Sequence, residues 1–223
     1  MNAAMPFIYD KLFAHFGHLQ WWPAQSPYEV MVGAVLTQNT AWRNVEKAIA
    51  NFDGQLSPQF VRDVDTAKLI ELIRPAGFFN QKAAYLKALT AWFAQYNYDI
   101  PTAQREPLDK LRAQLLAVKG IGKETADCVL LYALGLPTFV VDAYTLRLCT
   151  RYGLNVGTNA NAGASANYDV IKNFFEASLP RDAALFNNYH AVIVHLGKDF
   201  CKKSKPLCGT CPLKNACAQL GSR

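Results

Sequence analysis

Four cysteines late in the sequence are the residues whose type and spacing point most directly to chemistry. Six, two and five residues separate them, in the order Cys201, Cys208, Cys211 and Cys217. Four thiolates within 17 residues can fold around one centre, and all-sulfur ligation suits a [4Fe–4S] cluster or zinc. Structural zinc sites usually pair two short Cys-x2-Cys spacings, and this segment has only one. The spacing therefore predicts a metal site held by these four cysteines, with iron–sulfur favoured and zinc as the alternative.

A glycine turn between two apolar helical patterns is the second feature with chemical meaning. Residues 115–126 join these patterns through Gly120, Ile121 and Gly122. Glycine permits a tight turn and the close approach of another backbone. A helix begins directly after the turn, near Lys123, so its free N–H groups and positive dipole end could bind a DNA phosphate without reading base sequence. A Gly-x-Gly turn alone is equally compatible with an ordinary connection between helices.

The positive charge of the chain is concentrated around the cysteines. Residues 198–223 hold six basic residues and one acidic residue, Asp199, whereas the rest of the chain is almost neutral. Lys202, Lys203 and Lys205 lie between the first two cysteines. This concentration indicates an acidic partner such as a phosphate backbone, with a solubilising tail as the alternative.

Composition excludes several protein classes. The chain has 223 residues, a net charge of +6 and 51% hydrophobic residues, which is far from the profile of a disordered protein. No run of 18 apolar residues exists, so we expect no membrane association, and the N-terminal residues lack the pattern of a secretory signal. We therefore expect a cytoplasmic, nucleoid-associated bacterial protein whose cysteines are not paired in disulfides. Cys128 and Cys149 lie on apolar helical faces and are predicted to be core residues.

The secondary-structure elements that must position the cysteines and the glycine turn are predicted to be almost entirely helices. Apolar residues recur at helical spacing, and starts such as Ser26-Pro27 and stops such as Pro75 and Gly77 punctuate them. We predict an all-α fold of about ten helices with short connections. The predicted helices include 26–38, 42–52, 69–73, 80–93, 107–116, 125–134, 143–152, 168–179 and 182–196.

Three of these features together resemble one family. The glycine hairpin, the segment Leu136–Asp142 and the four-cysteine tail resemble the endonuclease III superfamily of DNA glycosylases, from about residue 26 onward. The resemblance implies a two-domain all-α fold with a C-terminal iron–sulfur cluster loop. Residues 23–134 would form a six-helix barrel-like domain that ends in the helix–hairpin–helix. The second domain would combine residues 1–22 with residues 135–223. It further implies an active site in the cleft, a [4Fe–4S] cluster at 201–217, and a monomer that flips a damaged base out of double-stranded DNA.

Two positions decide what chemistry the resemblance implies. Asp142 matches the family's catalytic aspartate, whose negative charge would stabilise the positive charge that develops on the sugar. The alternative is that Asp142 only caps the helix that follows it. Bifunctional members carry a nucleophilic lysine where this chain has Glu124, and a carboxylate cannot form a Schiff base. Lys123 is adjacent, but one residue turns a helix by about 100°, so it should point elsewhere.

One branch of the family is similar over further segments. Residues 21–23, 33–40, 74–83 and 119–124 resemble the bacterial 3-methyladenine DNA glycosylase III type, which also has a glutamate in place of the lysine. The resemblance implies that Trp22 and Trp42 line the base pocket together with Glu124. It also implies that Gln38 fills the gap left by the flipped base and that Phe78 is an apolar wedge inserted into the DNA.

These expectations combine into one functional hypothesis with two alternatives. The chain is expected to be a monofunctional DNA N-glycosylase for alkylated purines such as 3-methyladenine, acting in base-excision repair. The first alternative is an endonuclease III-like glycosylase for oxidised pyrimidines or mismatches, with or without lyase activity. The second is a DNA-binding module without catalysis, which the presence of Asp142 disfavours.

Overall fold

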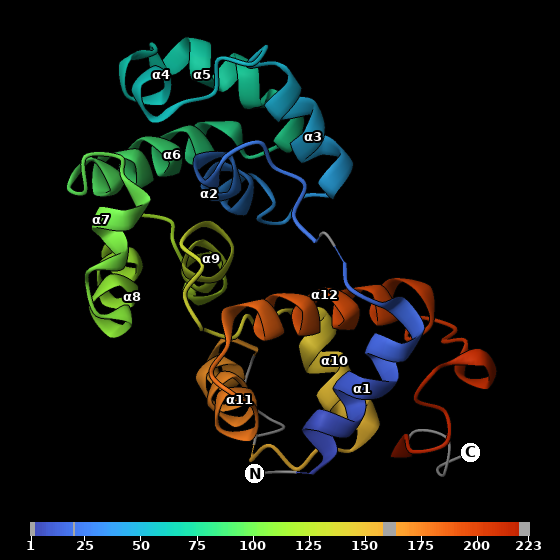
Figure 1. The fold of residues 1–223 in the computed structure, drawn as a ribbon. Coiled ribbons are helices and arrows are strands. Elements are labelled where there is room, and N and C mark those ends of the chain that lie inside the picture. Colours follow the sequence, from blue (N-terminus) through green and yellow to red (C-terminus); the bar gives the residue numbers. More distant parts are fainter. Residues whose placement is uncertain (1–2, 20, 158–163, 219–223) are drawn as a thin grey trace. The chain divides into compact units, whose positions relative to one another are not determined.

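The computed structural model describes residues 3–19, 21–157 and 164–218, and the chain forms two compact units (Figure 1). The unit that we call the composite unit joins Met1–Trp21 to Pro137–Arg223. The other, the hairpin unit, is the continuous segment Trp22–Leu136. All regular elements among the described residues are helical, which confirms the predicted all-α class. None of the described helices combines the length and apolar character needed to span a bilayer.

The hairpin unit is a sequence of short helices around the buried helix α2. Its elements are α2 (Pro27–Leu36), α3 (Trp42–Ala50), α4 (Pro58–Asp63), α5 (Thr66–Ile73), the 3-10 turn η1 (Arg74–Ala76), α6 (Phe79–Ala94), α7 (Ile100–Gln104), α8 (Leu108–Ala117), α9 (Lys123–Cys128) and the π-helical turn η2 (Val129–Ala133). Helix α2 starts as the sequence predicts, because Ser26 Oγ accepts a hydrogen bond from the Glu29 N–H at 3.1 Å and Pro27 takes the first helical position. Eight of its ten residues are buried, so α2 is the core of this unit.

Three helices were not predicted from the sequence, although the signals were present. Helix α4 begins at Ser57-Pro58, with Ser57 Oγ accepting from the Phe60 N–H, which repeats the start of α2. Helix α7 begins after Asp99, whose carboxylate accepts from the Thr102 N–H. Helix α1 (Ala4–Phe16) buries residues at positions 5, 8 and 12, a helical spacing.

A buried lysine joins the parts of the hairpin unit that meet at the start of α6. Lys82 is 2% exposed, and its Nζ donates hydrogen bonds of 2.8 Å to the Leu36 carbonyl, the Ala76 carbonyl and Thr40 Oγ1. Burial lowers the pKa of Lys82 to about 8. One side chain thus ties the C-terminal end of α2, the loop that follows it and the end of η1.

Helices α8 and α9 form the predicted helix–hairpin–helix. Gly120 has a φ of +82°, and a Cβ at this position would lie 2.2 Å from the ring of Tyr85 on α6. Gly120 is therefore required both by its backbone conformation and by close packing. A buried ion pair joins the two helices, because Arg112 Nε lies 2.8 Å from Asp127 Oδ1 and Asp127 is fully buried.

The composite unit is built on a long buried helix, α12 (Ala183–Asp199), against which α1 and α10 (Ala143–Tyr152) pack. Ten residues of α12 are buried. Helix α11 (Ala164–Ser178) and the short turn η3 (Cys208–Thr210) complete the unit. An aromatic core lies between these elements, with the Phe139 and Phe175 rings stacked at 4.2 Å and Phe186 and Tyr189 set against Phe139.

The segment 138–141, which leads into α10, is buried and pairs with no strand among the residues that the structure describes. Glu176 on α11 fixes it, because its carboxylate accepts hydrogen bonds from the Phe139 N–H at 2.7 Å and Thr138 Oγ1 at 3.2 Å. Lys172 Nζ lies 2.7 Å from the same Glu176 oxygen. Helix α11 therefore sets the position from which Asp142 begins the next helix.

Candidate functional site

Asp142 is the N-cap of α10, and its carboxylate is fixed by the first turn of that helix. Oδ1 accepts hydrogen bonds from the Tyr144 N–H at 2.9 Å, the Thr145 N–H at 2.8 Å and the Thr145 hydroxyl at 3.0 Å. The other oxygen, Oδ2, lies 3.4 Å from Nε2 of His190 on α12. The predicted capping role is thus confirmed, and it leaves the carboxylate 13% exposed rather than fully covered.

The surroundings of Asp142 keep its carboxyl group ionised. Burial on its own raises the pKa of Asp142, but the facing His190 imidazole and the hydrogen bonds from Thr145 outweigh burial, and the net effect lowers the pKa. A carboxylate held in this way stays negatively charged at neutral pH.

The hairpin presents different residues to the interior and to solvent. Ile121 is 5% exposed and anchors the turn, whereas Gly122, the N-cap of α9, is exposed. A Cβ at Gly122 would meet nothing within 4 Å. Lys123 is half-buried and Glu124 is exposed in the first turn of α9. The exposed N–H end of α9 is therefore open to a phosphate.

Gln38 and Phe78 occupy loops at the ends of α2 and η1. Gln38 Nε2 donates hydrogen bonds of 3.0 Å to the Gly120 carbonyl and to Thr125 Oγ1, so this side chain is attached to the hairpin. Phe78 is 63% exposed, and its backbone is left-handed, with a φ of 45°. A large apolar side chain that is both exposed and held in a strained backbone conformation is unusual, and such residues cluster at functional sites.

The two predicted pocket tryptophans are in contact. The rings of Trp22 and Trp42 meet edge to face, with centroids 5.3 Å apart, and Tyr132 lies against Trp22 at 5.3 Å with an interplanar angle of 31°. Gly33 makes room for this cluster, because a Cβ there would lie 3.2 Å from the Trp22 ring. Tyr132 belongs to the π-helical turn η2, where the sequence predicted a regular helix from 125 to 134. The extra residue in that turn changes which side chains face Trp22, and periodicity alone could not reveal it.

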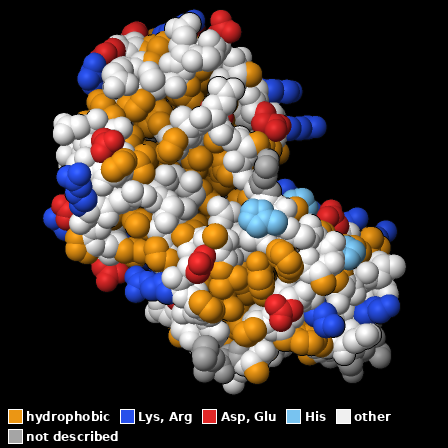
Figure 2. Space-filling model, in the orientation of Figure 1, with side chains coloured by type: hydrophobic (Ala, Val, Ile, Leu, Met, Phe, Trp, Pro, Cys, Tyr) orange, Lys and Arg blue, Asp and Glu red, His pale blue; other side chains and the backbone are white. Residues whose placement is uncertain are grey.

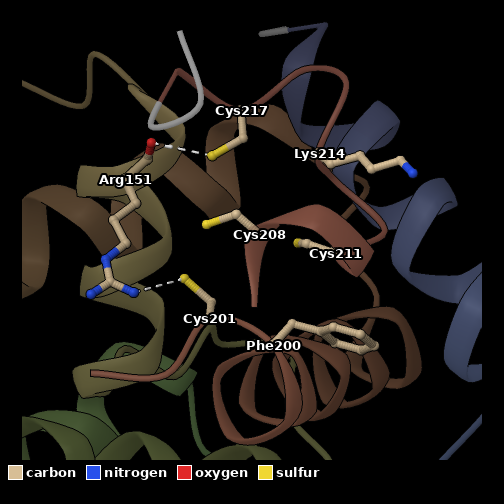
Figure 3. Close-up of a pocket in the computed structure, with 7 residues that line it drawn as sticks. All are labelled: Arg151, Phe200, Cys201, Cys208, Cys211, Lys214 and Cys217. Atoms are coloured by element: carbon tan, nitrogen blue, oxygen red, sulfur yellow. Dashed lines mark hydrogen bonds between the residues drawn. The ribbon is translucent and has the colours of Figure 1, made fainter. Parts of the chain in front are cut away.

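The four cysteines of the tail line one cavity of about 30 Å³, together with Arg151, Phe200 and Lys214 (Figure 3). Their sulfur atoms face this space, whereas the Lys214 ammonium points away from it. None of the four forms a disulfide. Burial, together with the neighbouring thiols of Cys201, Cys217 and Cys208, raises the pKa of Cys211. Among the described residues, no three His, Cys, Asp or Glu side chains are placed to hold a metal ion as they stand.

Helix α10 reaches the cysteine segment with two arginines. Arg151 donates from Nη1 to Cys201 Sγ at 3.4 Å and to the Lys202 carbonyl at 2.7 Å, and from Nη2 to the Lys203 carbonyl at 3.0 Å. Arg147 Nε donates to the Cys201 carbonyl at 2.7 Å. The backbone that carries the lysines is thus held by α10 as well as by any metal.

The side chains of Lys202, Lys203 and Lys205 are all exposed. In the view of Figure 2, Lys and Arg side chains lie at several separate places and form no continuous patch. The structure therefore leaves the tail lysines available to an acidic partner.

Cys128 and Cys149, predicted as core residues, are 7% and 2% exposed. Sequence reasoning did not single out Tyr132, Tyr85, His190 or Arg151. Each acts through a contact with a distant part of the chain, and no local spacing signals such a contact.

Comparison with known proteins identifies the family. The family model described as the HhH-GPD superfamily base excision DNA repair protein matches residues 32–182. The chain belongs to the HhH-GPD superfamily. It is 48% identical over 216 residues to a candidate DNA repair glycosylase of Methanocaldococcus jannaschii, covering 94% of each chain.

Two solved structures resemble this HhH-GPD protein. A trapped endonuclease III–DNA covalent intermediate matches with a TM-score of 0.80 and 22% identity, over 100% of this chain and 98% of the other, and shows that the fold is endonuclease III-like. The Helicobacter pylori 3-methyladenine DNA glycosylase, bound to 1,N6-ethenoadenine, matches with a TM-score of 0.66 and 29% identity, over 87% of this chain and 94% of the other. This HhH-GPD protein is a DNA glycosylase of base-excision repair.

Proposed function

We propose that the protein is a monofunctional glycosylase that removes alkylated purines from double-stranded DNA, using water as the nucleophile. The observation that carries this proposal is that Glu124, at the position of the family's lysine, is an exposed acid. Asp142, at the position of the family's aspartate, is ionised and 13% exposed. A carboxylate supplies no amine for a Schiff base, so the chain of covalent steps that leads to strand cleavage cannot start at residue 124.

Asp142 would act through its charge. Cleavage of the N-glycosidic bond moves electrons to the departing base and leaves positive charge on the sugar. A fixed carboxylate stabilises that charge without reorganising, and it can orient the water that completes hydrolysis. The three hydrogen bonds to Oδ1 and the partial exposure of the group match this role.

The aromatic cluster supports a purine substrate. Alkylated purines are electron-poor or cationic, and electron-rich ring faces attract such bases. Trp22, Trp42 and Tyr132 bring three rings together within the hairpin unit. The Helicobacter pylori relative, which is 29% identical, was solved with an alkylated adenine bound. The 5.3 Å edge-to-face contact leaves no slot between Trp22 and Trp42, so we expect a base to stack on the outer face of the cluster or to separate these rings.

We propose that the hairpin, Phe78, Gln38 and the tail lysines bind the DNA. Gly122 and Lys123 would contact phosphates, while Lys202, Lys203 and Lys205 would add charge that salt screens. Phe78, exposed and apolar, suits a wedge between base pairs. Gln38 would fill the vacated space once it releases its two hydrogen bonds to the hairpin.

We propose that the cysteine cavity holds a [4Fe–4S] cluster, with zinc as the alternative. Four thiols line one space, which suits either centre. The segment has only one short Cys-x2-Cys spacing, whereas structural zinc sites usually pair two, so the spacing favours the cluster. Cys201, Cys208, Cys211 and Cys217 would hold the cluster, which would fix the tail segment. Iron and sulfide analysis, with absorbance near 400 nm, tests this assignment; stoichiometric zinc without iron would overturn it.

A second candidate is excision of oxidised pyrimidines or mismatched bases. The specific observation in its favour is that the endonuclease III structure matches 100% of the chain, including the cysteine tail, whereas the 3-methyladenine glycosylase matches 87%.

Base release from a panel of duplexes separates the two functions. Each duplex carries one defined lesion: 3-methyladenine, 1,N6-ethenoadenine, thymine glycol, or a G·T or G·U mismatch. Release of the alkylated purines alone is the expected result. Release confined to thymine glycol or to the mismatches would replace the alkylpurine assignment with the second candidate.

A further inference from the structure

We propose that His190 is a positioning residue for Asp142, holding the carboxylate oxygen that the helix cap leaves free; the proposal rests on the glycosylase function above and deepens it. The two oxygens of Asp142 are treated differently by the fold. All three hydrogen bonds from the first turn of α10 end on Oδ1, and Oδ2 faces His190 Nε2 at 3.4 Å. Bonds to one oxygen allow the carboxylate plane to pivot about that oxygen. A contact at the second oxygen fixes the plane.

The imidazole is itself held firmly. The His190 side chain is 5% exposed. Its ring stands nearly perpendicular to the rings of Trp21 and Phe139, with centroid distances of 5.7 Å and 6.4 Å. A ring packed between two others cannot turn away from Asp142 without moving them.

The neighbours of His190 on α12 are fixed to α1 and to the segment after it. The Tyr189 hydroxyl donates to the Met5 carbonyl at 2.9 Å, and the Asn188 side chain accepts from the Leu19 N–H at 2.8 Å. The contact with Asp142 therefore joins two rigid elements, the N-terminal end of α10 and the middle of α12.

The other ionisable groups around the pair are directed elsewhere. On α11, the Tyr168 hydroxyl accepts from the Val141 N–H, and Glu176 is bound by Lys172. On α12, the His195 ring contacts the Trp21 ring edge to face, and the Lys198 ammonium lies over the same ring. On α1, the Tyr9 hydroxyl accepts from the Asn188 amide. Of the described ionisable side chains, His190 is the one that the structure sets against Oδ2.

A buried carboxylate needs this partner for two reasons. Burial disfavours the ionised form, and the imidazole offsets that effect. A proton on Nε2, which lies 3.4 Å from Oδ2, would also keep the carboxylate at one angle toward the sugar, which is the preorganisation that electrostatic catalysis requires.

The test compares an amide that can reach Oδ2 with one that cannot. His190→Gln places an N–H donor near the position of Nε2, whereas the shorter side chain in His190→Asn and the apolar one in His190→Leu do not. His195→Gln and His195→Asn are matched controls, because His195 is on the same helix but 38% exposed. Single-turnover base release from an alkylated duplex is measured against pH, with DNA affinity measured in parallel.

We expect His190→Asn and His190→Leu to slow base release about 10- to 100-fold, the usual cost of removing an outer partner of a functional group. DNA affinity and the His195 variants should stay at wild-type levels, and His190→Gln should retain most of the rate. The acid limb of the rate profile should move to higher pH in the Asn and Leu variants. The reason is that activity requires ionised Asp142, and without the imidazole burial raises its pKa. A purely structural effect would lower the rate equally at all pH values.

A carboxyl ¹³C NMR titration gives a readout that does not depend on activity. The pKa of Asp142 should rise in His190→Asn relative to the wild type, and an unchanged pKa would overturn the inference. Equal rates for the Gln, Asn and Leu variants, or a parallel loss at every pH, would also overturn it. A wild-type protein that releases no base from any lesion would instead overturn the proposed function, so the two failures are distinguishable.

Discussion

The surroundings of Asp142 and the loop that carries Phe78 differ in how far they bury and fix the side chain. Asp142 is largely buried, its oxygens face four polar groups, and the elements around it are rigid. Phe78 is exposed, apolar and held in a left-handed backbone conformation. Under the proposed function, the group proposed to perform chemistry is therefore fixed before DNA binds, whereas the residue proposed to distort DNA is held in a conformation that lowers stability. Such strain persists only where the surroundings enforce it.

Asp142→Asn should have the largest effect on activity. An amide oxygen can still cap α10, so the folded structure should survive, but the negative charge is lost. We expect base release to fall by about 10³-fold with lesion binding retained. Single-turnover kinetics and a fluorescence binding assay measure both quantities. Base release at the wild-type rate would place the catalytic charge elsewhere.

Lys82→Met should have the largest effect on stability. The apolar replacement removes the ammonium donor from the buried carbonyls of Leu36 and Ala76, and of these the Ala76 carbonyl keeps the hydrogen bond from the Thr40 hydroxyl. We expect the free energy of unfolding to fall by about 3 kcal/mol, the cost of unsatisfied buried acceptors. Urea denaturation measures this loss. Lys87→Met is the matched control on the same helix, since Lys87 bonds to carbonyls in a more exposed setting. An equal loss in both variants would contradict a special role for Lys82.

Phe78→Gly should have smaller effects, which differ in sign: stability should rise and base release should fall. Glycine accepts a positive φ without strain, so we expect stability to rise by about 1 kcal/mol. Base release from duplex DNA should fall about tenfold, because no apolar wedge remains. Thermal unfolding and single-turnover kinetics on duplex and single-stranded lesions measure these effects. A loss of stability would show that Phe78 belongs to the core of its unit and not to a strained exposed loop.

Local features of the fold were predictable from the sequence, and long-range contacts were not. The starts of α2 and α10 follow from Ser26-Pro27 and Asp142, because capping depends on neighbours within three residues. Helix α6 begins at Phe79, although the sequence predicts a start at residue 80 with Asn80 as the cap, because Phe78 takes a left-handed conformation that no propensity favours. The segment 138–141 has no strand partner among the described residues, and Glu176 from α11 satisfies part of its backbone instead.

The same division holds for the site. The helix cap formed by Asp142 and the gathering of the four cysteines around one cavity were predictable from residue type and spacing. The roles proposed for Asp142, Trp22 and the cysteines rest on the family resemblance. Three contacts in the site join residues that are far apart in sequence: His190 with Asp142, Tyr132 with Trp22, and Arg151 with the cysteine segment. The contact of Tyr132 also depends on a π-helical turn. A single sequence holds no record of such contacts.

Borohydride trapping during base release from an alkylated duplex tests the central claim most directly. The wild-type protein should release free base, leave the strand intact and form no trapped protein–DNA adduct, because water and not an amine attacks the sugar. Lys123→Gln should bind DNA more weakly, because it loses a proposed phosphate contact, but it should likewise form no adduct. Glu124→Lys should yield a trapped adduct. A wild-type adduct that disappears in Lys123→Gln would contradict the account and make Lys123 the nucleophile.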